Sequence, residues 1–172
     1  MFTPNSQMKD ILSTSPLIES ILFQKYRLGF SSNFYLTDTL EEVFKKNKMT
    51  HLIEDFLKEI QEILDLEKKI QINPKELKEL LEKESVLLLD VREDFEREIA
   101  KIENSFLLTK DLAKEILFSW EKNTKMVFYC HTGVRSLQAA FFFYKNGFRN
   151  IWNLNGGIHR WAKEIDPNIP LY

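Results

Sequence analysis

The chain has 172 residues, of which 44% are hydrophobic and 29% are charged, a balance that is typical of a folded protein and argues against wholesale disorder. The net charge of −2 argues against a nucleic-acid-binding protein, which needs a basic face. The apolar stretches are too short to cross a bilayer, and the first residues lack the basic start and apolar run of a signal peptide. The single cysteine excludes an intramolecular disulfide and any site with several cysteine ligands. We therefore expect a cytoplasmic protein that binds neither membrane, nucleic acid, metal nor cofactor.

Residues 1–69 are predicted to form a small all-α module. Ser15 before Pro16 indicates a helix start, because the hydroxyl caps the first turn and proline is favoured at the first helical position. Thr39 with Glu42 three residues later is typical of a capping box and begins a second helix. A third helix follows, with Leu, Ile and Phe at helical spacing and charged residues on the opposite face.

Residues 70–172 alternate between strand and helix patterns, and the charged run 67–69 before them is a candidate hinge. Five strands are predicted, at 70–72, 86–91, 105–109, 126–129 and 150–154. Helices are predicted after Asn73-Pro74, over 110–120, over 136–145 and after Gly156-Gly157, where the glycines allow a tight passage from strand to helix. Such alternation favours an α/β fold with a parallel sheet of about five strands and helices on both faces.

The stretch from Met126 to Ser136 combines a buried strand, a short loop and the start of a helix, and Cys130 stands at the end of the strand. Ligands of open α/β sheets bind at the carboxyl ends of the strands. A loop that enters a helix there points backbone N–H groups inward and adds the positive end of the helix dipole, which favours a thiolate. Gly133 permits a backbone conformation that a side chain would obstruct, and Arg135 is expected to fork onto an oxyanion or the loop's own acceptors. An isolated cysteine would more simply be a small buried residue, but this combination of residues predicts that Cys130 is a nucleophile.

Three short motifs characterise this part of the chain: Asp90-Val91-Arg92 after a hydrophobic strand, Cys130-x-x-Gly133-x-Arg135-Ser136, and Leu154-Asn-Gly156-Gly157-Ile-His-Arg-Trp161. On these motifs, residues 70–172 resemble the rhodanese domain. The resemblance implies a rhodanese-like fold and a sulfurtransferase that carries a sulfane sulfur as a persulfide on Cys130. It further implies a donor such as thiosulfate or a persulfide, and cyanide, a thiol or a sulfur-carrier protein as acceptor. The substrate-binding residues implied by the resemblance are His131, Thr132, Gly133, Val134, Arg135 and Ser136.

Two alternatives to sulfur transfer follow from the same loop. Related phosphatases and arsenate reductases have five residues between cysteine and arginine, which makes room for a tetrahedral phosphoryl group. Only four residues separate Cys130 from Arg135, so a Cys-dependent phosphatase is disfavoured. The main alternative is a non-catalytic rhodanese-like binding or regulatory module, although decayed copies of the domain often lose the nucleophile that is present here.

The residues around the loop allow further expectations. Asp90 and Arg92 are expected to support the site through an ion pair that ties the sheet end to Arg135 or to the backbone. His131 either bears on donor binding or faces solvent, and Ser136 either donates its hydroxyl toward the sulfur or caps the helix, which we favour. Many rhodaneses carry Gly-His after the Asp-Val-Arg strand, whereas this chain has Glu98 nearby, so that edge of the pocket is altered and donor choice stays open.

The N-terminal module has a resemblance of its own. Residues 15–32, together with the capping box at Thr39, resemble the N-terminal helical domain of iron–sulfur cluster repair proteins. In that family a Phe is followed by Cys-Cys, whereas Phe30 here is followed by Ser31 and Ser32. Serine lacks the soft thiolate, so cluster or persulfide handling is not carried over. The expected role of this module is docking or dimerisation, and the Phe-rich helices favour a homodimer.

Overall fold

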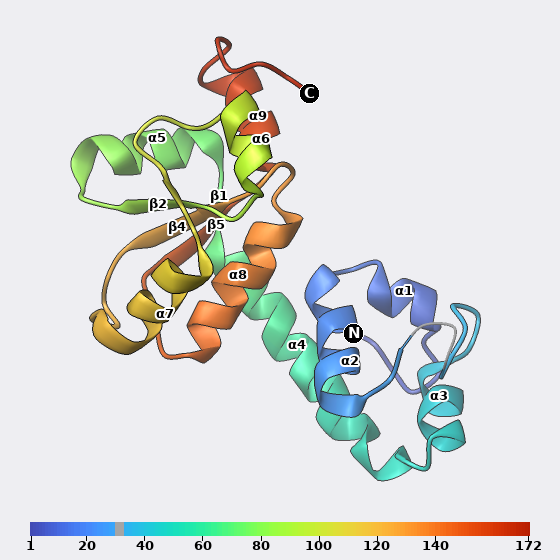
Figure 1. The fold of residues 1–172 in the computed structure, drawn as a ribbon. Helices are drawn as coiled ribbons and strands as arrows, with labels where there is room; N and C mark the ends of the chain where they lie inside the picture. Colours follow the sequence, from blue (N-terminus) through green and yellow to red (C-terminus); the bar gives the residue numbers. More distant parts are fainter. Residues whose placement is uncertain (30–32) are drawn as a thin grey trace. The chain divides into compact units, whose positions relative to one another are not determined.

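The computed structural model describes residues 1–29 and 33–172, which form two compact units, Met1–Lys68 and Lys69–Tyr172 (Figure 1). The expectations for Phe30, Ser31 and Ser32 lie outside the described residues. Across the described residues, no helix has both the length and the apolar character that a membrane span requires.

The first unit contains the three predicted helices, α2 (Pro16–Tyr26), α3 (Leu40–Lys46) and α4 (Ile53–Ile70), together with α1 (Met8–Leu12) and a single 3-10 turn, η1 (Thr50–Leu52). The Ser15 hydroxyl accepts a hydrogen bond from a backbone N–H in the first turn of α2, and Thr39 and Glu42 form both halves of a capping box at α3. These two helix starts are confirmed. The charged run 67–69, a candidate hinge, lies in the last turn of α4, and the boundary between the two units falls within it.

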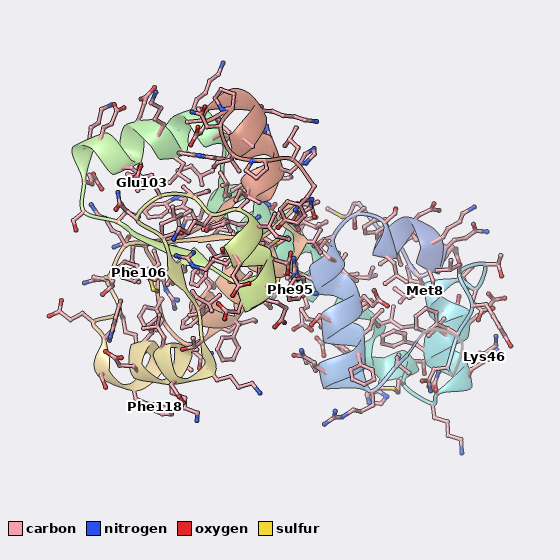
Figure 2. The ribbon with its side chains drawn as sticks, turned by 45° about the horizontal axis from the view of Figure 1, so that its top comes forward. Met8, Lys46, Phe95, Glu103, Phe106 and Phe118 are labelled. Atoms are coloured by element: carbon pink, nitrogen blue, oxygen red, sulfur yellow. The ribbon has the colours of Figure 1, made fainter. Side chains whose placement is uncertain are left out.

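The core of this first unit is built on aromatic side chains. The rings of Tyr26, Phe44 and Phe56 contact one another with centroid separations of 5.1 to 5.7 Å. Met8 is fully buried, whereas Lys46 projects outward and pairs with the partly buried carboxylate of Asp38 (Figure 2). The unit therefore has a hydrophobic core of its own.

The second unit is an α/β fold with one five-stranded sheet, as the sequence predicts. Its strands are β1 (Gln71–Ile72), β2 (Leu87–Asp90), β3 (Phe106–Leu107), β4 (Met126–Tyr129) and β5 (Ile151–Leu154). The order is β1-β5-β4-β2-β3, and every neighbouring pair is parallel. The helices are α5 (Pro74–Lys83), α6 (Asp94–Ile99), α7 (Lys110–Ser119), α8 (Val134–Lys145) and α9 (Gly157–Glu164). Two details differ from the prediction: α6 was not expected, and α8 begins before Ser136.

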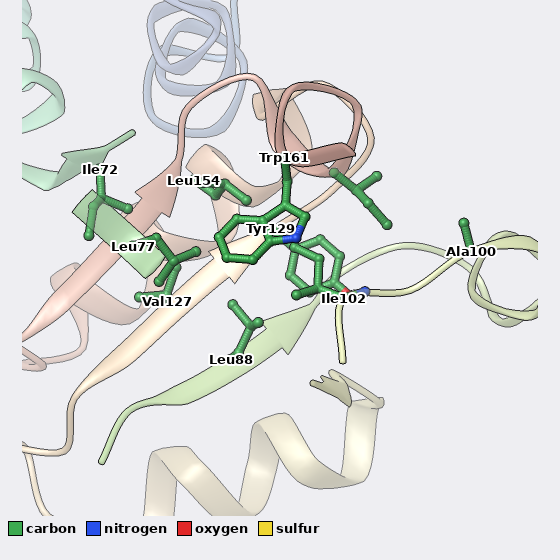
Figure 3. Close-up of a cluster of buried hydrophobic side chains, with 10 residues drawn as sticks. Ile72, Leu77, Leu88, Ala100, Ile102, Val127, Tyr129, Leu154 and Trp161 are labelled. Atoms are coloured by element: carbon green, nitrogen blue, oxygen red, sulfur yellow. The ribbon is translucent and has the colours of Figure 1, made fainter. Parts of the chain in front are cut away.

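Helices cover both faces of the sheet. On one face Val127 and Tyr129 pack against Leu77 of α5 and Trp161 of α9 (Figure 3). On the other face the ring of Phe128 stacks on a phenylalanine of α8 at 5.1 Å. Burial on both faces explains why β4 is a continuous apolar run without alternation.

The register of the two central strands fixes the position of the site. Asp90 at the end of β2 lies opposite Tyr129 at the end of β4. Because parallel strands end at the same edge of a sheet, Cys130 and Arg92, which follow these strands, lie at one edge. The predicted functional motifs are thus brought together by strand pairing.

Candidate functional site

Cys130 lies directly after β4, and its sulfur accepts two hydrogen bonds. The backbone N–H of Gly133 donates to Sγ at 3.1 Å, and the hydroxyl of Ser136 donates to Sγ at 3.3 Å. Cys130 is almost completely buried, and hydrogen-bond donors directed at one sulfur stabilise negative charge there. The arrangement therefore suits a thiolate or a persulfide anion.

Ser136 does not cap α8, so that interpretation of the sequence is wrong. The N-cap of α8 is Gly133, with φ +96° and no side-chain cap. Because Ser136 stands in the first turn after this earlier start, its buried hydroxyl points at Cys130 instead. The Ser136 hydroxyl thus donates a hydrogen bond to the sulfur, and no side chain caps the start of α8.

The start of α9 donates hydrogen bonds to the backbone of the loop that follows Cys130. The N–H of Ile158 donates to the carbonyl of Cys130 at 2.8 Å, and the N–H of His159 donates to the carbonyl of His131 at 3.1 Å. This close approach requires Gly157, whose φ is +59° and whose Cβ, if present, would overlap both carbonyl oxygens. The glycine pair therefore gives the tight passage that the sequence predicts and also seats the loop.

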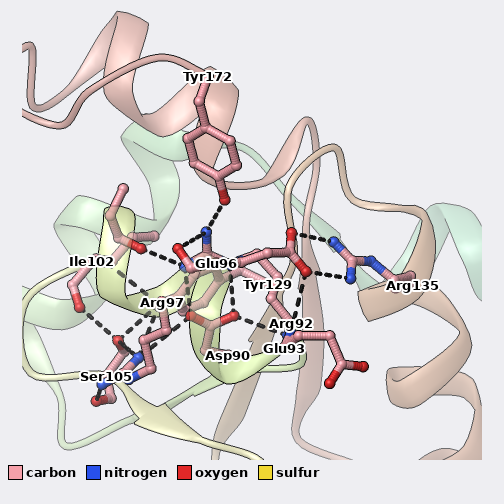
Figure 4. A network of polar contacts seen from close by, with 11 residues as sticks. Asp90, Arg92, Glu93, Glu96, Arg97, Ile102, Ser105, Tyr129, Arg135 and Tyr172 are labelled. Atoms are coloured by element: carbon pink, nitrogen blue, oxygen red, sulfur yellow. Dashed lines mark hydrogen bonds and ion pairs between the residues drawn. The ribbon is translucent and has the colours of Figure 1, made fainter.

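Arg135 forms a bidentate ion pair with Glu96 of α6. Each terminal nitrogen of the guanidinium donates to one carboxylate oxygen at 2.7 Å (Figure 4). Hydrogen bonds from Arg135 lower the pKa of Glu96 to about 2. The hydrogen bonds to Glu96 likewise raise the pKa of Arg135, with a smaller contribution from Cys130.

The sequence analysis did not identify Glu96, and it gave Arg135 a different partner. The guanidinium is held by Glu96, not by acceptors of its own loop. Glu96 closes a capping box with Glu93 at the start of α6. Glu93-x-x-Glu96 has the spacing of a capping box but begins with Glu in place of the usual Ser or Thr, so the helix-start signal in the sequence is weak.

Asp90 and Arg92 form a fully buried ion pair at the end of β2. The Nη2 of Arg92 donates to Oδ2 of Asp90 at 2.7 Å, and its Nε donates to Oδ1 at 2.9 Å. Arg92 also donates to the carbonyls of Glu96 and Ala100, at 3.3 and 2.6 Å. The pair therefore ties the sheet end to the backbone around α6, and it does not reach Arg135.

A second layer of polar contacts surrounds this pair. Arg97 donates to Asp90 at 3.4 Å and to the hydroxyl of Ser105 at 2.8 Å, and the Tyr129 hydroxyl lies 2.8 Å from the same serine oxygen. Burial raises the pKa of Tyr129 to about 12, so its hydroxyl remains protonated and bound within this network. These contacts hold α6, and with it Glu96, against the edge of the sheet (Figure 4).

His131 packs between two other rings. Its ring centroid lies 4.7 Å from that of Tyr172 and 5.6 Å from that of His159. The Tyr172 hydroxyl accepts a hydrogen bond from Arg92, which places this tyrosine over the site. Burial lowers the pKa of His131, which favours the neutral ring at neutral pH. His159 and Tyr172 thus join the site, and neither was among the expected site residues.

Two further loop residues face outward. Thr132 and Val134 are exposed, and within the described parts of the chain no hydrogen bond joins Thr132 to the sulfur. Among the described residues there is also no group of three or more His, Cys, Asp and Glu side chains placed to hold a metal ion.

The domain is an α/β domain in which a cysteine lies in a loop between a parallel strand, β4, and the following helix, α8. Comparison with known proteins gives its family. The model of the rhodanese-like domain matches residues 73–164, and the chain belongs to this family.

The chain is 36% identical over 104 residues to the probable adenylyltransferase/sulfurtransferase MoeZ of Mycobacterium tuberculosis, which covers 59% of this chain and 26% of that protein. It is 29% identical over 103 residues to the tRNA uridine(34) hydroxylase of Escherichia coli, covering 56% and 29%. The chain thus spans less than a third of the length of these curated relatives. The solution structure of the rhodanese-like domain of an Anabaena sp. protein is 25% identical with a TM-score of 0.50, covering 55% of this chain and 74% of that one.

Proposed function

We propose that this protein is a rhodanese-type sulfurtransferase, which moves a sulfane sulfur from a donor to a thiophilic acceptor through a persulfide on Cys130. The observation that carries the proposal is the pair of donors, Gly133 N–H and Ser136 hydroxyl, directed at one sulfur. Membership of the rhodanese-like family and the likeness to a relative named as a sulfurtransferase support sulfur transfer in general.

The first half-reaction loads the enzyme. The Cys130 thiolate attacks the outer sulfur of a donor such as thiosulfate, forming a new S–S bond while the donor's own S–S bond breaks. The bonding electron pair leaves with the remainder of the donor, as sulfite when thiosulfate is used. The persulfide anion formed on Cys130 then occupies the position toward which the loop's hydrogen-bond donors and the start of α8 are directed.

The second half-reaction unloads the enzyme. An acceptor nucleophile, cyanide in an assay or a thiol in a cell, attacks the outer sulfur of the persulfide. The S–S bond breaks, and its electron pair returns to Cys130 as the thiolate. Because the loop donors stabilise negative charge on the sulfur, they favour this cysteine as a leaving group.

The test follows thiocyanate formation from thiosulfate and cyanide, with an organic persulfide as a second donor. The wild-type chain is expected to turn over at least one of these donors, and Cys130→Ser is expected to abolish turnover. Absence of turnover with every sulfane donor would overturn the proposal in favour of a non-catalytic binding module. Release of phosphate from an aryl phosphate without thiocyanate formation would favour a phosphatase.

A further inference from the structure

The charge around the sulfur is set by pairs of arginine and carboxylate groups. Three guanidinium groups occur in the network of Figure 4, those of Arg92, Arg97 and Arg135. Arg92 and Arg97 share Asp90 and direct other N–H groups to backbone carbonyls and to the hydroxyls of Tyr172 and Ser105. Arg135 is the one of the three that belongs to the cysteine loop, next to Ser136, whose hydroxyl donates to Cys130, and both of its terminal nitrogens are bound by Glu96.

The positive charge of Arg135 is neutralised by a carboxylate that is fixed in position. The side chain of Glu96 is only 11% exposed, and the N–H of Glu93 donates to the same carboxylate at 3.1 Å. Glu96 therefore stays ionised and in place at neutral pH, and its charge offsets that of the arginine. His131 adds little positive charge at neutral pH, because burial lowers its pKa.

This balance bears on which donor the site accepts. Thiosulfate is a dianion, and its outer sulfur has to approach a thiolate, so it needs a free cation nearby. An ionised organic persulfide, R–S–S⁻, carries one negative charge on its sulfur and suffers half of that repulsion. Val134, which precedes Arg135 in the cysteine loop, is 47% exposed and offers an apolar contact that suits an organic donor body better than a small inorganic anion.

We propose that Glu96 is a specificity-determining residue, which occupies Arg135 and thereby selects singly charged organic persulfides over thiosulfate. The inference rests on the proposed sulfur transfer. In the favoured loading step the Cys130 thiolate attacks the terminal sulfur of R–S–S⁻, a new S–S bond forms on Cys130, and the donor's S–S bond breaks. Its electron pair leaves on the organic thiolate, so two negative charges enter the step and two leave it.

The experiment measures how fast Cys130 gains one sulfur, by intact mass at short times, from cysteine persulfide and from thiosulfate. The readout is the ratio of the two second-order loading constants. In Glu96→Gln the ratio should shift toward thiosulfate by about tenfold, the effect of one unit charge removed a few ångströms from a dianion rather than from a monoanion. Glu82→Gln removes the same charge from an exposed position of α5 and should leave the ratio unchanged.

A second variant keeps the test valid if Glu96→Gln does not fold. Arg135→Gln leaves the Glu96 carboxylate and its capping bond to Glu93 but removes the cation, so the ratio should shift away from thiosulfate. A ratio that is unchanged in the variants that fold, or one that moves in the same direction in both, would overturn the role of Glu96. Failure of the wild-type chain to load from either donor would instead overturn the proposed sulfur transfer.

Discussion

Gly157 offers the sharpest structural prediction, because a single methyl group at this position meets the backbone of the cysteine loop. A Cβ on Gly157 would lie 2.5 Å from the carbonyl oxygen of His131 and would also overlap the carbonyl of Cys130. Both are backbone atoms that cannot rotate away, so α9 and the loop would have to separate. The hydrogen bonds that the N–H groups of Ile158 and His159 donate to these carbonyls would be strained at the same time.

The expected cost of Gly157→Ala has two parts. An alanine at φ +59° loses about 1–2 kcal/mol from its left-handed backbone. Forcing an extra methyl group into a packed contact adds about 1–3 kcal/mol. The free energy of unfolding should therefore fall by roughly 2–5 kcal/mol, measured by urea denaturation. Because the clash falls on the loop, sulfur loading of Cys130 should also be slower in the protein that remains folded.

Gly147→Ala is the matched control. Gly147 has φ +98°, but the nearest atom to its added Cβ is a side-chain carbon of Lys122 at 3.7 Å, an ordinary contact. This variant should lose only the backbone part, about 1–2 kcal/mol, and should load sulfur at the wild-type rate. Equal losses of stability in the two variants, or normal loading in Gly157→Ala, would refute the argument that α9 seats the loop.

Three further predictions concern polar groups. Asp90→Asn should lower the free energy of unfolding by about 3–5 kcal/mol, because it leaves the buried Arg92 without its ion-pair partner. The control Asp111→Asn, at a side chain that is 95% exposed, should leave the free energy of unfolding unchanged. Equal effects of the two variants in urea denaturation would contradict the stabilising role of the buried ion pair. Since the pKa of Glu96 is about 2, below its ordinary 4.5, its stabilising contribution is present above pH 4.5 and is lost as the pH falls toward 2. The difference in unfolding free energy between wild type and Glu96→Gln should therefore shrink between pH 4.5 and pH 2. A constant difference over that range would argue against an ionised, paired Glu96. Ser136→Ala should slow sulfur transfer by at least about tenfold, because it removes a hydrogen bond to Cys130 Sγ. The effect should be smaller than that of losing an oxyanion-hole donor, because sulfur is a weak acceptor. The control Ser119→Ala, at an exposed position, should not slow sulfur transfer.

The sequence predicted what local patterns and strand periodicity control. The continuous apolar run of β4, the parallel sheet and the cysteine loop follow from residues that are close together in the chain. The glycine pair before α9 was also predictable, because few residues other than glycine fit two successive positive φ values, here at Gly156 and Gly157.

The parts that were missed depend on contacts between distant residues. Arg135 and Glu96 are 39 residues apart, and Tyr172 is 80 residues from Arg92, so no local pattern pairs them. Helix α6 is only six residues long and mostly charged, and its capping box begins with Glu93 where Ser or Thr is the usual signal. The same segment lacks the Gly-His of the family pattern, and only the structure shows that it supplies the carboxylate for Arg135.

The central claim is that Cys130 carries a transferable sulfur, and intact-mass analysis tests it most directly. After incubation with a sulfane donor and removal of the excess, the wild-type chain should gain the mass of one sulfur atom. The added mass should map to the peptide that contains Cys130, disappear on treatment with cyanide, and be absent from Cys130→Ser. A wild-type chain that gains no sulfur from any donor, or a Cys130→Ser chain that gains it equally, would contradict the account.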